Sequence, residues 1–118
     1  MASMMPQSTY WKFNNMKKVI RDGKVAILYS PRHGAGWYSW HGIEELVYDP
    51  KIVDMVQRGE DPDTIQEYCL EVYGKKSYFG GADQLQIFWL DQGTEFYIDE
   101  YDGAEIVVTK SIIKWLLA

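Results

Sequence analysis

Tight turns formed by an Asp-Gly pair constrain the fold of this chain more than any other feature. Asp22-Gly23 divides the β-forming segments KKVIR and KVAILYS, and Asp102-Gly103 divides EFYIDEY from AEIVVT. An Asp-Gly pair readily takes the positive φ angles of a type I′ turn, which joins two antiparallel strands through two residues. A third turn is expected at Gln92-Gly93, after LQIFWL. The sequence therefore predicts a mainly antiparallel sheet.

Two segments in the middle of the chain carry the start and stop signals of helices. DPKIVDMVQRG begins with Asp-Pro at 49–50, and DPDTIQEYCLEVYG begins with Asp-Pro at 61–62. An Asp cap followed by proline starts a helix, and the glycine at the end of each segment stops it. Cys69 lies in the apolar stripe of the second segment, so we expect it in the core rather than as a nucleophile. We expect WYSW (37–40) and EELVY (44–48) to be further strands, and KSIIKWLLA to be a short C-terminal helix.

These elements predict the α+β class: a single compact domain over residues 16–118, with a mainly antiparallel sheet, two central helices and a short C-terminal helix. A chain of 118 residues fits one domain. Residues 1–15 lack the apolar core of a signal peptide. They are expected to be a leader or tag-like segment, because MKKVIRDGKVAIL from Met16 is typical of a natural start. No apolar run approaches the roughly 18 residues that span a bilayer, so no membrane association is expected.

Charge is distributed unevenly along the chain. Residues 1–42 carry six Lys or Arg and one acidic residue, whereas residues 43–118 carry six Lys or Arg and sixteen acidic residues. The net charge of −5 argues against binding of duplex nucleic acid, which needs a dense basic face. A small anionic ligand held by one or two cations remains compatible with this composition.

The segment SPRHGAGWYSWHG, residues 30–42, is a candidate ligand loop. It lacks both the third glycine of a dinucleotide fingerprint and the GK[ST] of a phosphate-binding P-loop. A generic site remains open, with a cation and backbone amides for phosphate and an aromatic ring for a base. The other interpretation is a glycine turn whose tryptophans fill the core. The residues proposed for binding are Arg32, His33, Gly34, Gly36 and Trp37.

A second loop, YFGGAD at residues 78–83, combines an aromatic residue, two glycines and a carboxylate. Phe79 is expected to stack on a base and Asp83 to accept a hydrogen bond from a ribose or base, unless the aromatics pack beneath the sheet. Weaker candidates for a second anionic site or a subunit interface are Arg58, Lys110 and Lys114.

Metal and catalytic motifs are not expected. The acidic run IDEYDGAE lacks the spacing of a calcium loop and is interpreted as the solvated rim of a hairpin turn. His33 and His41 lack a third zinc ligand. Neither Ser30 nor Ser39 lies in a GxSxG elbow. We therefore predict no metal, no cofactor and no enzymatic activity.

The strings GAGW, GGADQL and EYDGAE, within VAILYSPRHGAGWYSW and YFGGADQLQIFWLDQGTEFYIDEYDGAE, resemble a family of small proteins from phages and prophages. The likeness covers residues 16 to about 106. This family is similar to the first type of Thoeris anti-defence proteins. The resemblance implies an oligomeric binder in the cytoplasm of the infected bacterial host, which sequesters a cyclic ADP-ribose signal without cleaving it.

Two functions follow from this sequence. The first is the nucleotide sponge that the resemblance implies, which we expect to be a homo-oligomer whose pocket lies between two subunits. The second is a protein–protein inhibitor or adaptor that uses its aromatic loops as a docking surface.

Overall fold

The computed structural model describes residues 17–32, 34, 36–74 and 79–110. The predicted leader, residues 1–15, lies outside these residues, and so does the predicted C-terminal helix apart from Lys110. The elements are, in chain order, β1 (Ile20–Arg21), β2 (Lys24–Tyr29), α2 (Tyr38–His41), α3 (Glu45–Tyr48), α4 (Pro50–Gln57), α5 (Pro62–Tyr73), the 3-10 helix η1 (Gly80–Gln84), β3 (Gln86–Asp91), β4 (Phe96–Tyr101) and β5 (Ala104–Thr109).

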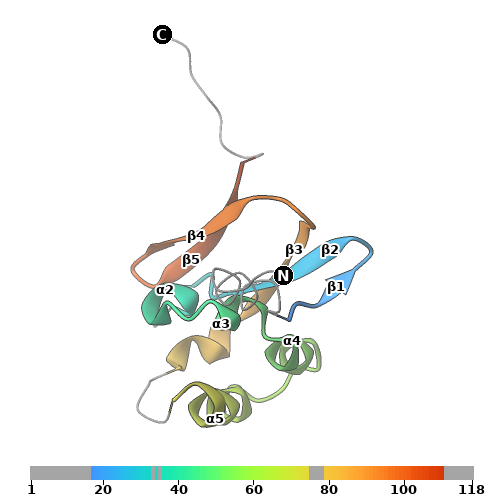
Figure 1. Cartoon of the computed structure of the whole chain (residues 1–118). Coiled ribbons are helices and arrows are strands. Elements are labelled where there is room, and N and C mark those ends of the chain that lie inside the picture. Colours follow the sequence, from blue (N-terminus) through green and yellow to red (C-terminus); the bar gives the residue numbers. More distant parts are fainter. Residues whose placement is uncertain (1–16, 33, 35, 75–78, 111–118) are drawn as a thin grey trace, which may run out of the picture.

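The strands form two antiparallel sheets. One has the order β1-β2-β3, and the other is the two-stranded ribbon β4-β5. Helices α4, α5 and η1 lie on one side of the three-stranded sheet and the ribbon lies on the other (Figure 1). The fold is therefore α+β, as the sequence predicts, although the strands form two separate sheets instead of one.

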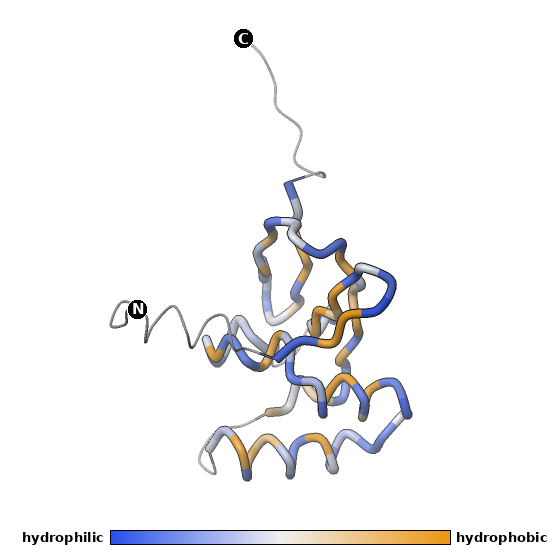
Figure 2. Tube along the Cα trace, turned by 45° about the vertical axis from the view of Figure 1, so that its right-hand side comes forward, coloured by the Kyte–Doolittle hydropathy of each residue, from blue (hydrophilic) through white to orange (hydrophobic). Residues whose placement is uncertain are grey.

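Strand β2 is the centre of the molecule because both of its faces are buried. Ala26 and Leu28 pack toward the helices with Leu46, Ile52 and other apolar residues. Val25 and Ile27 belong to a second cluster that includes residues of the ribbon. The hydropathy trace follows this arrangement, with apolar strands and a polar turn between β1 and β2 (Figure 2). A continuous apolar run such as VAIL is typical of a strand covered on both faces.

The local signals for turns and helix starts are confirmed. Asp22 and Gly23 have φ angles of 52° and 76°, and Asp102 and Gly103 have 53° and 83°. The Asp49 carboxylate accepts hydrogen bonds from the amides of residues 51 and 52 at the start of α4. No helix among the described residues is long and apolar enough to cross a membrane.

Two expected strands are helices instead. Residues 38–41 form α2, which ends at Gly42 with a hydrogen bond of 2.7 Å from the Gly42 amide to the Tyr38 carbonyl. Residues 45–48 form α3, in which Leu46, Val47 and Tyr48 are all buried. Tertiary packing overrides the β propensity of these aromatic and β-branched residues. The expected loop at 80–84 is likewise the short helix η1.

Candidate functional site

Three glycine-containing segments that are distant in sequence meet at one place in the structure. A Cβ atom added at Gly81 would overlap the carbonyl oxygen of Gly36, and one added at Gly103 would overlap the carbonyl oxygen of Gly34. The Gly34 amide also donates a hydrogen bond to the Asp102 carbonyl, at 3.4 Å. We call Gly34, Gly36, Gly81 and Gly103 the glycine junction. It brings together the strings GAGW, GGAD and EYDGAE, on which the family resemblance depends.

A buried carboxylate, that of Glu105 on β5, lies beside this junction. The residue is 0% exposed. Its Oε1 accepts a hydrogen bond from the Ser30 amide at 2.9 Å. Its Oε2 accepts bonds from the Trp37 amide at 2.9 Å, the Ser39 amide at 2.8 Å and the Ser39 hydroxyl at 2.6 Å. The expectation that this acidic run is only a solvated rim is therefore wrong for Glu105.

The hydrogen bonds to Glu105 also explain why residues 37–40 do not form a strand. In a strand, amides two residues apart are separated by roughly 6.6 Å. Two such amides cannot both reach one oxygen atom at the distances found for Trp37 and Ser39. The loop therefore curves around an anion that belongs to the chain itself. Its Ser30, Gly34, Trp37 and Ser39 amides all donate within the protein, so these four amides are already occupied.

The two aromatic residues expected to stack on a ligand are core residues. Trp37 and Phe79 are both 0% exposed. The Trp37 indole donates to the Leu46 carbonyl at 2.8 Å, and its ring meets that of Phe79 edge to face. The Phe79 ring also stacks on that of His41, with 4.4 Å between ring centroids. The stacking prediction is wrong for Trp37 and Phe79, and the core interpretation is right for both.

Exposed residues border the glycine junction instead. Arg32 and Asp83 are exposed, and no described residue forms an ion pair with Arg32. Trp40 is 56% exposed, and its ring lies against Gly36, where an added Cβ would come within 2.6 Å of Trp40 Cδ1. Tyr101, next to the 102–103 turn, is 79% exposed. We call these four residues the rim, because Trp40 contacts Gly36 and because Arg32, Asp83 and Tyr101 each lie two residues in sequence from a junction glycine.

Sequence reasoning missed two of the rim residues, Trp40 and Tyr101. The segment WYSW gave no reason to prefer one tryptophan over the other while it was assigned to a strand. A strand would place Trp37 and Trp40 on opposite faces without showing which face is buried. In the structure Trp37 precedes the helical turn 38–41 and is buried, whereas Trp40 lies within that turn and is exposed. Tyr101 could have been found from its position opposite Ala104 on the outer side of the ribbon, where Tyr97 and Ile106 are also exposed.

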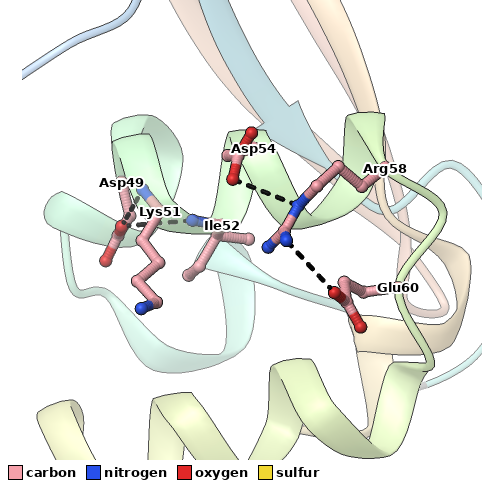
Figure 3. Close-up of polar contacts among 6 residues, drawn as sticks. All are labelled: Asp49, Lys51, Ile52, Asp54, Arg58 and Glu60. Carbon is pink, nitrogen blue, oxygen red and sulfur yellow. Dashed lines mark hydrogen bonds and ion pairs between the residues drawn. The ribbon is translucent and has the colours of Figure 1, made fainter.

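The remaining candidates are paired or undescribed. Arg58 at the end of α4 forms ion pairs with Asp54, at 3.2 Å, and Glu60, at 3.5 Å (Figure 3). Lys110 forms an ion pair with Glu95 at 2.9 Å. Both cations are already partly neutralised, which weakens them as phosphate contacts. The other two predicted residues, His33 and Lys114, lie outside the described residues.

Two neighbouring clefts flank the edge-to-face pair of Tyr48 and Phe96. The larger lies between the ribbon and the three-stranded sheet, and the smaller lies between β4 and the helices α2 and α3. Their volumes are about 420 and 300 Å³. The larger cleft has an apolar floor that includes Ile27. Its charged lining residues are one cation, Lys18, and two acids, Asp91 and Glu95. Because the acids outnumber the cation, this cleft does not favour a negatively charged diphosphate. Neither cleft is lined by a residue predicted from the sequence to bind ligand.

A second buried carboxylate, that of Asp49, joins α4 to α5. Its Oδ2 accepts hydrogen bonds from the hydroxyls of Tyr68, at 2.9 Å, and Tyr73, at 2.6 Å. Burial and these bonds raise the pKa of both tyrosines. Burial, helped by the charge of Asp49, raises the pKa of the Cys69 thiol to about 12. This thiol is therefore a core group, as expected, and a poor nucleophile.

Among the described residues, no group of three or more His, Cys, Asp or Glu side chains could hold a metal ion. Comparison of the chain with protein-family models, curated proteins and solved structures finds no match. The function must therefore be argued from the rim and the glycine junction.

Proposed function

We propose that this chain binds a nucleotide signal of the cyclic ADP-ribose class and holds it without cleavage, as a phage anti-defence sponge. The observation that carries the proposal is the convergence at the glycine junction. The three strings that resemble the anti-defence family meet there. Asp83 and Tyr101 lie within two of these strings, and Arg32 and Trp40 flank the third, GAGW.

The rim contains the chemistry that such a ligand needs. A purine base has a flat face, and stacking on an aromatic side chain contributes about 1–3 kcal/mol per base. Trp40 and Tyr101 offer exposed rings for this purpose. The guanidinium of Arg32 can donate two parallel hydrogen bonds to a phosphate. Asp83 can accept hydrogen bonds from ribose hydroxyls.

The charges around the junction restrict the ligand. The buried carboxylate of Glu105 occupies the amides of Ser30, Trp37 and Ser39. Arg32 is the one cation among the four rim residues, and we propose that it meets a phosphate. One guanidinium matches the compact pyrophosphate of a cyclic ADP-ribose better than a long polyphosphate or a duplex. A second copy of the chain could supply a further wall and cation, which is why we also propose a homo-oligomer.

Binding without cleavage is proposed because the nearest buried acid is already occupied. Both oxygens of the Glu105 carboxylate accept hydrogen bonds from the loop. The thiol of Cys69 is buried in the core with a raised pKa. Neither group is placed to attack or protonate a ligand on the rim.

A second candidate function is docking on a protein partner. The outer face of the β4-β5 ribbon exposes Tyr97, Tyr101 and Ile106, and exposed apolar patches of this kind often mark interaction surfaces. This candidate predicts that the chain gains no stability from nucleotides.

The experiment is calorimetric titration and thermal shift against cyclic ADP-ribose isomers, ADP-ribose and NAD. We expect a cyclic isomer to bind and to be recovered chemically unchanged. Arg32→Ala and Trp40→Ala should each weaken binding by roughly tenfold or more, from the loss of a charged hydrogen bond or a stacking contact.

Matched controls are Arg21→Ala, an exposed arginine on β1, and Tyr97→Ala, an exposed aromatic on β4. Both should bind like the wild type. Absence of binding by every cyclic isomer would contradict the proposal. Turnover of the ligand would show an enzyme instead of a sponge.

A further inference from the structure

We propose that Glu105 is a positioning residue for the ligand site: an internal anion that holds Ser30, Trp37 and Ser39 and thereby presents Arg32 and Trp40. This inference rests on the proposed function, because it assigns the residue that organises the same rim. It differs from a general packing role, because the negative charge of the side chain is what the loop requires.

The first argument is the number and kind of the groups that face the carboxylate. Three backbone amides and one hydroxyl donate to it, from Ser30, Trp37 and Ser39. Amides that converge on one point form an anion-binding concavity. Among the described residues, no Lys or Arg forms an ion pair with Glu105. The loop amides therefore supply the main stabilisation of this buried charge.

The second argument is where the bonds hold the loop. Ser30 and Glu105 exchange two bonds, since the Glu105 amide also donates to the Ser30 carbonyl at 2.8 Å. At the other end of the loop, the amide and hydroxyl of Ser39 are both held. Arg32 follows the first anchor by two residues, and Trp40 directly follows the second. One side chain from β5 thus fixes both ends of the segment that carries these two rim residues.

The third argument is the contrast with the rest of the rim. Asp83 belongs to η1 and Tyr101 to β4, and neither segment donates a hydrogen bond to the Glu105 carboxylate. Loss of the carboxylate should therefore disturb Arg32 and Trp40 and leave Asp83 and Tyr101 in place. A residue that served only the core would not divide the rim in this way.

The test is chemical rescue. Glu105→Ala removes the carboxylate and leaves its donors facing a space that a small carboxylate can fill. We expect this variant to bind cyclic ADP-ribose at least tenfold more weakly than the wild type, and sodium formate to restore part of the affinity. Sodium chloride at equal ionic strength should not do so. Glu95→Gln, which removes an exposed carboxylate just before β4, should bind with the same affinity in formate as in chloride of equal ionic strength.

Glu105→Gln and Ser39→Ala keep the inference testable if Glu105→Ala does not fold. Glu105→Gln keeps the volume of the side chain but places an NH₂ group among hydrogen-bond donors. The affinity of this variant for cyclic ADP-ribose should therefore fall. Ser39→Ala removes one donor and should weaken binding by a smaller factor. Wild-type affinity in Glu105→Gln, or the absence of any formate effect on Glu105→Ala, would overturn the inference.

Failure of the proposed function would be seen separately. If the wild type binds no cyclic ADP-ribose, hydrogen exchange of the Trp37 and Ser39 amides replaces affinity as the readout. Fast exchange in Glu105→Ala that formate slows would still support an internal anion that orders the loop. Unchanged exchange would overturn it.

Discussion

Substitution of alanine for Gly103 tests the glycine junction directly, because the chain contains a matched control. Gly23 and Gly103 are both the second residue of an Asp-Gly turn, with φ angles of 76° and 83°. An added Cβ meets nothing within 4 Å at Gly23 but overlaps the Gly34 carbonyl at Gly103. The two substitutions therefore share the same backbone strain and differ in the overlap.

The magnitudes follow from this difference. A left-handed conformation costs an L-residue about 1–2 kcal/mol, and this term applies to both variants. Forcing an extra carbon into a packed site costs about 1–3 kcal/mol more, and this term applies only to Gly103→Ala. In a domain of this size, roughly 4 °C of melting temperature corresponds to 1 kcal/mol. Gly103→Ala should thus melt at least a few degrees below Gly23→Ala.

The assay is urea unfolding and thermal melting of both variants, followed by titration with cyclic ADP-ribose. Gly103→Ala displaces Gly34, so it should also weaken ligand binding, whereas Gly23→Ala should bind like the wild type. Equal loss of stability in the two variants would refute the close approach of the 102–103 turn to the loop.

Three further predictions concern the core. The free energy of unfolding should fall as the pH rises above about 10, because the folded protein keeps Tyr68 and Tyr73 protonated on Asp49 whereas both tyrosines ionise in the unfolded chain. Denaturant titrations across this pH range should show a shallower fall for the double variant Tyr68→Phe/Tyr73→Phe. Cys69, with its pKa raised to about 12, should react with a thiol reagent at pH 8 only as fast as the protein unfolds, and rapid labelling of native protein would contradict its burial. Phe79→Ala should cost about 3–5 kcal/mol in urea unfolding, since the ring is fully buried, and a loss below 1 kcal/mol would place it at the surface.

The parts of the fold predicted correctly are those set by short-range chemistry. An Asp-Gly pair adopts the positive φ angles of a tight turn between two paired strands. The carboxylates of Asp49 and Asp61 cap helices that begin within three residues of them. These interactions depend on neighbours in sequence. They can therefore be predicted without knowledge of the rest of the chain.

The candidate site was predicted only in part, because its geometry depends on long-range contacts. Arg32 and Asp83 are exposed as a ligand site requires, but Trp37 is buried and Trp40 takes the exposed position. Which of the two tryptophans is buried depends on the hydrogen bonds from the Trp37 and Ser39 amides to Glu105, which is 68 and 66 residues away in sequence. No local pattern marks Glu105 as buried, since it follows an Asp-Gly turn in an acidic run.

The distance in sequence between the loop and Glu105 has a consequence for how the protein matures. Ser30 and Glu105 are 75 residues apart, and contacts of such separation form slowly because a large part of the chain must be ordered before they close. While β5 is still inside the ribosome, the growing chain lacks the Glu105 carboxylate that holds Ser30, Trp37 and Ser39. Ligand would then be captured only by completed molecules, and recovery of binding during refolding would lag behind the formation of the helices.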